Sequence, residues 1–201
     1  MKYYLKLVCY TLLVIAAVYV WMKPGKKNQV ISQEDVVARG AELVRVGGCA
    51  DCHTPKVMTP QGLVDDSTRL FAGHPREVEV SPVELHEGPG EASEAGMTAW
   101  VGPWGISYAS NLTPDPATGL WSEESFIKSM RTGKKRGHGR AILPPMPWRE
   151  LGQSTDADLK AIYAYLNSLP AVFNSVPDPK PPTVPSTARA TVLVKGKSRA
   201  N

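Results

Sequence analysis

Two thiols and an imidazole stand within five residues, in the pentapeptide Cys49-Ala50-Asp51-Cys52-His53. The C-x-x-C-H spacing is the attachment signature of a c-type haem. Two thiols separated by two residues can form thioethers to one macrocycle, and the adjacent imidazole then lies beneath its iron. The sequence therefore predicts one covalently attached haem c, held by Cys49, Cys52 and His53, with His53 as an iron ligand.

Other functions of two closely spaced cysteines fit the chain less well. The third cysteine, Cys9, lies in an apolar run, and three cysteines exclude a disulfide framework. A thioredoxin-like redox site expects a preceding strand in a βαβ pattern, whereas a helical pattern and Gly47-Gly48 precede Cys49. A zinc site needs further Cys or closely spaced His, but the remaining histidines are dispersed, at His74, His86 and His138.

A later loop is expected to supply the second axial ligand of the iron, and methionine is the usual residue. Met58 is close to His53 in sequence, and Met130 falls on a helical apolar stripe. Met146 lies among prolines that fix the backbone, in the segment Leu143-Pro144-Pro145-Met146-Pro147-Trp148. We therefore expect Met146 at the iron and its neighbour Pro145 at the cofactor, and Met97 and His138 remain the alternatives. A neutral thioether favours the ferrous state and leaves no open iron position, which indicates electron transfer rather than catalysis.

The first 22 residues predict a transmembrane anchor. Residues 7–22 carry no charge, and about 20 apolar residues at about 1.5 Å each match the hydrocarbon thickness of a bilayer. The alternative is a cleaved signal peptide, but no small-x-small cleavage site follows Ala17. Since haem is attached on the outer face of the cytoplasmic membrane, we expect a single-pass protein with its N-terminus inside and its haem domain on the periplasmic side.

The rest of the chain predicts one mostly α domain with long loops, in keeping with 17 Gly and 18 Pro. We expect a linker at 23–31, a cofactor domain at 32–176 and a Pro-rich extended or disordered tail at 177–201.

Capping residues predict three helices, which begin after Ser32, Ser122 and Thr155. From about Thr54 to Ser110 the sequence has no sustained period, and we expect an irregular excursion with a small hairpin or a helical turn. The role of residues 61–102 within it is not evident. Carbonyls of Thr54-Pro55 lie within reach of the His53 imidazole N–H and are expected to orient it.

Four motifs in order, GGCADCHTP, NLTPDPATGLWSEESFIKSMRTG, GRAILPPMPW and STDADLKAIYAYLNSLP, give the chain a family resemblance. It resembles the bacterial cytochrome c subunits of membrane-bound alcohol and sugar-acid dehydrogenases. The resemblance implies a class I-like cytochrome c haem-wrapping fold with His53 and Met146 as axial ligands. It also implies that Asn111 and Thr113 lie in a loop at the haem pocket, although the local chemistry of NLTPD is equally consistent with a simple turn. The first domain helix would cross the last, with Gly40 and Ala41 against Tyr163 and Leu166. The subunits of that family often carry three haem domains, whereas this chain has one C-x-x-C-H.

These observations predict a single-electron carrier, not an enzyme, with other redox proteins as partners: a dehydrogenase or quinol-oxidising complex, and an oxidase or another cytochrome. A haem-based sensor with a labile sixth iron position is the alternative. The net charge of +4 is scattered, which disfavours nucleic-acid binding, and a saturated iron leaves no place for a small-molecule substrate. A basic run before the ligand loop is either a surface that steers an acidic partner or a solvated turn; it contains Lys134, Lys135, Arg136 and Arg140.

Overall fold

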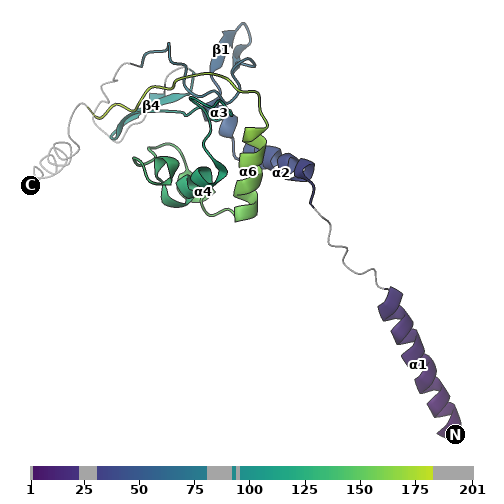
Figure 1. The fold of residues 1–201 in the computed structure, drawn as a ribbon. Helices are drawn as coiled ribbons and strands as arrows, with labels where there is room; N and C mark the ends of the chain where they lie inside the picture. The colour runs from purple at the N-terminus through teal and green to yellow at the C-terminus, as the bar shows by residue number, and fades with distance from the viewer. Residues whose placement is uncertain (1, 23–30, 81–91, 94–95, 183–201) are drawn as a thin grey trace, which may run out of the picture. The chain divides into compact units, whose positions relative to one another are not determined.

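The computed structural model describes residues 2–22, 31–80, 92–93 and 96–182 (Figure 1). The chain divides into two units, Met1–Ser32 and Gln33–Asn201. The predicted linker falls on residues outside this description except for Ile31, and so does the tail from residue 183 onward.

The first unit is the helix α1 (Lys2–Met22). Within the part of the chain that the structure describes, no helix combines the length and apolar character needed to cross a membrane. Lys6 and the tyrosines Tyr3, Tyr4 and Tyr10 occupy the first half of α1. This finding contradicts the predicted membrane anchor, with its inside N-terminus and periplasmic haem domain, and that prediction is withdrawn.

Two helices of the second unit begin at capping residues that the sequence indicates. The Ser122 hydroxyl accepts a hydrogen bond from Ser125 N at 3.3 Å, and the Thr155 hydroxyl accepts one from Asp158 N at 3.1 Å. Gly133, with φ of 66°, ends the first of these helices in the left-handed conformation that glycine adopts freely. The helical elements are α2 (Gln33–Val46), α3 (Cys49–His53), α4 (Glu123–Thr132), the 3-10 turn η1 (Lys135–Gly137), α5 (Trp148–Leu151) and α6 (Asp156–Asn167).

Two small antiparallel sheets correct the expectation of a mostly α domain, because the unit is a mixture of helices and strands. The first sheet is the hairpin β1 (Lys56–Thr59) and β2 (Gly62–Asp65). The second has the order β3 (Ala92–Ser93), β4 (Ala99–Gly102) and β5 (Gly105–Tyr108). Val101 and Ile106 pair across β4 and β5 and are both buried, so this sheet has a small core of its own. Part of the expected irregular excursion is therefore regular structure.

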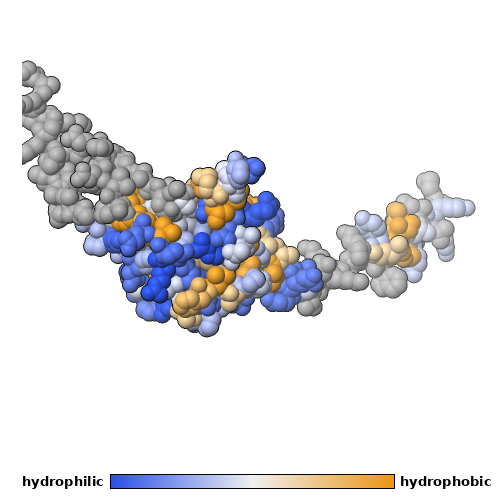
Figure 2. All heavy atoms as spheres, turned by 90° about the horizontal axis from the view of Figure 1, so that it is seen from above, coloured by the Kyte–Doolittle hydropathy of each residue, from blue (hydrophilic) through white to orange (hydrophobic). Residues whose placement is uncertain are grey.

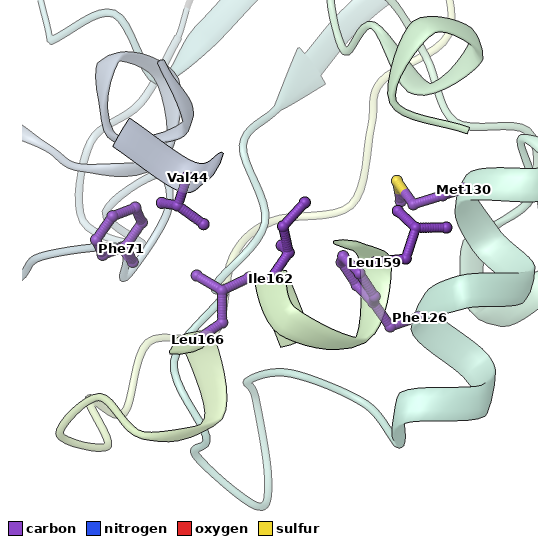
Figure 3. Close-up of a cluster of buried hydrophobic side chains, with 7 residues drawn as sticks. All are labelled: Val44, Phe71, Phe126, Met130, Leu159, Ile162 and Leu166. Atoms are coloured by element: carbon purple, nitrogen blue, oxygen red, sulfur yellow. The ribbon is translucent and has the colours of Figure 1, made fainter. Parts of the chain in front are cut away.

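The main core lies where α2 and α6 cross (Figure 1). Leu159, Ile162 and Leu166 of α6 lie between Val44 and Phe71 on one side and the side chains of α4 on the other (Figure 3). The expected crossing of α2 and α6 is present. A Cβ on Gly40 would lie 2.8 Å from Tyr165 Cβ and closer still to the Ala161 carbonyl oxygen. Only glycine permits this close approach of the two helices.

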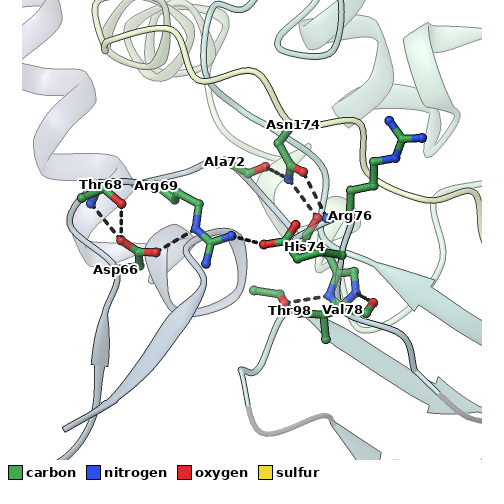
Figure 4. A network of polar contacts seen from close by, with 10 residues as sticks. Asp66, Thr68, Arg69, Ala72, His74, Arg76, Val78, Thr98 and Asn174 are labelled. Carbon is green, nitrogen blue, oxygen red and sulfur yellow. Dashed lines mark hydrogen bonds and ion pairs between the residues drawn. The ribbon is translucent and has the colours of Figure 1, made fainter.

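A buried polar network joins the segment after α6 to the loop after β2 (Figure 4). The Asn174 amide donates to the carbonyl oxygens of Ala72 and His74, at 2.7 and 2.8 Å. Further along, Lys180 and Ile106 exchange two backbone hydrogen bonds, so the chain beyond α6 lies against β5. The face of the second unit that Figure 2 shows is mostly hydrophilic, with apolar patches between the polar residues.

Candidate functional site

The C-x-x-C-H residues form the short helix α3, which Gly48 in a left-handed conformation (φ 62°) joins to α2. His53 at its end is buried. Its Nδ1 donates a hydrogen bond to the Ser110 carbonyl oxygen at 2.8 Å, and its own carbonyl oxygen accepts one from Gly73 N at 2.8 Å. Since a carbonyl oxygen can only accept, the proton sits on Nδ1, and Nε2 keeps the lone pair that a metal ligand needs.

The carbonyl group that orients the His53 ring is not the one expected from the sequence. Thr54 and Pro55 were expected to accept from the imidazole, but Ser110 does so from 57 residues away in sequence. Thr54 has another structural role, because its hydroxyl accepts a hydrogen bond from Phe71 N at 3.0 Å. The turn after α3 is therefore fastened to the loop that precedes β3, while the ring is oriented by the NLTPD loop.

Burial keeps the three motif side chains uncharged. Burial lowers the pKa of His53, partly offset by its hydrogen bond to Ser110, so the ring is neutral at pH 7. Burial likewise raises the pKa of the Cys49 thiol and that of the Cys52 thiol. Both cysteines are free and half-buried. The site thus offers two reduced thiols and a neutral imidazole from a single helical turn.

A lysine outside the C-x-x-C-H motif holds α3 in place. Lys56 Nζ donates to the carbonyl oxygens of Ala50 and Thr54 at 3.2 and 3.0 Å, and pairs with Asp65 Oδ1 at 2.6 Å. Its side chain is 11% exposed. No local sequence signal marks it, because the Asp65 contact depends on the pairing of β1 with β2.

The proline-rich loop around Met146 is anchored by its backbone. The Pro144 carbonyl oxygen accepts a hydrogen bond from Ser107 Oγ at 2.6 Å, and the Met146 carbonyl oxygen accepts one from Trp148 N at 2.9 Å. The Met146 side chain is half-buried and packs against the same core cluster as Cys49, whereas Pro145 is exposed. The structure thus places Met146 and the first cysteine around one core.

The other candidate ligands lie in different surroundings. Met130 is buried in the core with 6% exposure, and Met58 is 74% exposed on the hairpin. Met97 is 44% exposed, and His138 is exposed on the turn after η1. Among these residues and Met146, only Met146 is a partly buried methionine that packs against the core cluster.

Asn111 and Thr113 brace the loop that carries the Ser110 carbonyl. The Asn111 carboxamide oxygen accepts from Thr113 N and Oγ1 at 2.9 and 2.7 Å, and its Nδ2 donates to the Val172 carbonyl oxygen at 2.8 Å. Thr113 Oγ1 also accepts from Val172 N at 3.1 Å. Both side chains are buried, and their hydrogen bonds to Val172 connect the loop to the segment after α6. Their contact with a cofactor stays a prediction.

The residues present fit a c-type haem. Such a group requires two reduced thiols at C-x-x-C spacing, an imidazole nitrogen with a free lone pair, and apolar packing surface. The neutral thiols of α3 and the Nδ1-protonated ring of His53 meet the first two requirements. Partly buried apolar residues around the core meet the third, among them Leu112, Ile142 and Met146.

Comparison with known proteins agrees with this class of site, although no protein-family model matches the chain. The chain is 31% identical over 144 residues to a nicotinate dehydrogenase subunit of Pseudomonas putida. It is 29% identical over 136 residues to the gluconate 2-dehydrogenase cytochrome c subunit of Pantoea cypripedii. It is 27% identical over 136 residues to the cytochrome c subunit of the quinone alcohol dehydrogenase of Gluconobacter oxydans.

These matches cover 71%, 67% and 67% of this chain, but only 9%, 23% and 21% of the respective relatives. The homologues are thus subunits of dehydrogenases, most of them named as cytochrome subunits, at modest identity over about 70% of the chain. This confirms the family resemblance of the four motifs. The chain spans less than a quarter of the length of each of these three relatives.

Proposed function

We propose that the chain is an electron-transfer protein with one haem c attached through Cys49 and Cys52 and ligated by His53 and Met146. When bound, the haem supplies reversible one-electron chemistry at its iron. The observation that carries the proposal is the state of His53: a buried, neutral imidazole whose Nδ1 is fixed by Ser110, at the end of the helix that bears both thiols. The cytochrome subunits among its relatives support the same function.

Each of the chain's own residues has a definite task under this proposal. The Ser110 carbonyl oxygen, which accepts the hydrogen bond from His53 Nδ1–H, would hold the ring in place and leave the Nε2 lone pair free to bind the iron. The Cys49 and Cys52 thiols would hold the macrocycle on α3 as thioethers, each formed by addition of the S–H across one of its vinyl groups. The anchored loop around Met146 would supply the second ligand with little conformational entropy left to lose. We further propose that the donor is a dehydrogenase or quinol-oxidising complex, that the acceptor is an oxidase or another cytochrome, and that the chain itself is not an enzyme.

A reductive titration, followed by addition of carbon monoxide to the reduced protein, tests this function. The chain, produced in a host that attaches c-type haem, should take up one electron per chain and show low-spin bands in both redox states. Carbon monoxide should leave the reduced spectrum unchanged, because both axial positions are filled. A reduced form that binds carbon monoxide stoichiometrically would instead support a sensor or ligand-binding protein with a labile sixth position.

A further inference from the structure

We propose that Lys56 tunes the reduction potential of the haem through the fixed charge of its ammonium group, and that Asp65 opposes it. The inference rests on the proposed function, since it needs a haem on α3. Neither residue belongs to the C-x-x-C-H motif or to the proposed ligands. They are the two ends of the hairpin that follows the motif.

The ammonium group of Lys56 is held at one place. It has three N–H donors, and three acceptors surround it: the carbonyl oxygens of Ala50 and Thr54 and the carboxylate of Asp65. These two carbonyls come from the residues on either side of the segment Asp51–His53. A charge with all its donors engaged and little exposure cannot turn away into solvent, so it acts on α3 continuously.

The hairpin explains why Lys56 and Asp65 meet. Lys56 begins β1 and Asp65 ends β2, and they are directly paired across the two strands. The Asp65 side chain is 48% exposed, against 11% for Lys56. Water therefore screens the carboxylate more than the ammonium, and the pair leaves a net positive field on the side of α3.

The sign of the effect follows from charge balance. Reduction brings one electron to the haem and no atoms, so the positive charge at the iron falls by one. A fixed positive charge nearby disfavours the oxidised form more than the reduced form, and it raises the midpoint potential. Removing the Lys56 charge should lower the potential, and removing the Asp65 charge should raise it by a smaller amount.

The test is the midpoint potential of four variants in mediated spectroelectrochemical titrations at pH 7: Lys56→Met, Lys56→Arg, Asp65→Asn and, as control, Lys160→Met. Lys160 is an exposed lysine of α6, so its loss changes the net charge by the same amount at a different element. We expect a lower potential for Lys56→Met, a higher one for Asp65→Asn, and values near that of the wild type for Lys56→Arg and Lys160→Met. The covalent haem content of each variant is measured first.

The opposite signs separate a charge effect from a loosened helix. A loosened α3 would admit water in both Lys56→Met and Asp65→Asn and shift both potentials downward, which would overturn the inference, as would an unchanged Lys56→Met. If Lys56→Met does not accumulate with haem, the rise expected for Asp65→Asn and the retained potential of Lys56→Arg still decide the matter. A wild-type chain without covalent haem would overturn the proposed function itself, and this inference with it.

Discussion

His53 is oriented by a carbonyl that lies 57 residues further along the chain. The sequence predicts a ligand role for this histidine through its two neighbouring cysteines, which is a purely local pattern. It gives no means of finding Ser110, because a backbone acceptor has no side-chain signature and the contact arises only when the NLTPD loop folds against α3. The same holds for Lys56, whose carboxylate partner is brought to it by strand pairing.

The proposed role of Met146 as an iron ligand predicts a gain of ligand binding when its sulfur is removed. In Met146→Ala, the sixth iron position should open, and the reduced protein should bind carbon monoxide and shift its Soret band. Met58→Ala is the matched control, because Met58 is 74% exposed on the hairpin and should leave the spectrum unchanged. Carbon monoxide binding by Met97→Ala, with Met146→Ala unaffected, would move the ligand assignment to Met97.

Asp66 predicts a pH-dependent loss of stability. Its carboxylate accepts from Thr68 Oγ1 at 2.6 Å, Thr68 N at 3.0 Å and Arg69 Nε at 2.7 Å (Figure 4). The hydrogen bond from the Thr68 hydroxyl, followed by that from Arg69, lowers the pKa of Asp66 below its ordinary value of 3.8. A lowered pKa means that this stability is present above the ordinary value and is lost as the pH falls through the folded-state value.

Asp66→Asn should therefore lower the free energy of unfolding at pH 7 by about 1–2 kcal/mol. The difference from the wild type should shrink as the pH falls below 3.8, the ordinary value of this carboxyl group. Denaturant unfolding of both proteins from pH 7 down to acid pH measures it. A difference that stays constant across this range would show that the carboxylate charge contributes nothing.

Among the elements, the helices were the part that sequence patterns predicted. Ser122 and Thr155 cap the helices that they were expected to cap, because capping is a contact between residues three apart. The second sheet could not be predicted, since β4 and β5 are only four residues long and each has a Gly at its turn end, and the chain at Lys180 joins β5 from more than 70 residues away. Their pairing depends on tertiary contacts that no local period records.

The α2–α6 crossing depends on one glycine. Gly40→Val should lower the free energy of unfolding by about 2–3 kcal/mol, because any Cβ there meets the Ala161 carbonyl and Tyr165 and must push the helices apart. Ala38→Val is the control on the exposed face of the same helix and should cost less than about 1 kcal/mol through helix propensity alone. Equal losses in the two variants, measured by denaturant unfolding, would contradict the packing argument.

At the scale of the whole molecule, the basic run before the Met146 loop brings four positive charges close together in sequence. Lys134, Lys135, Arg136 and Arg140 form no ion pair with any described residue, whereas Arg131 nearby pairs with Asp156 at 2.6 Å. Arg136 lies over the Trp121 ring at 5.6 Å. Unpaired charges on one side of a redox protein select the charge of the reagents that approach it there.

Replacing both exposed ends of this run, in Lys134→Glu/Arg140→Glu, should slow electron exchange with anionic hexacyanoferrate and accelerate it with cationic hexaammineruthenium. At low ionic strength we expect changes of about 2- to 10-fold, which vanish as salt shortens the Debye length. The matched control is Arg45→Glu/Lys160→Glu, the same charge change on exposed residues of α2 and α6. Equal responses of the two variants in stopped-flow experiments would make the basic run an ordinary solvated turn.

The proposed electron-transfer function depends most directly on the covalent bond between the chain and one haem. The intact mass of the denatured chain, after extraction with acidified acetone, measures it. We predict a mass that exceeds that of the polypeptide by one haem, and a Cys49→Ala/Cys52→Ala chain with no added mass. A wild-type chain at the bare polypeptide mass, or one carrying a second haem, would contradict the account.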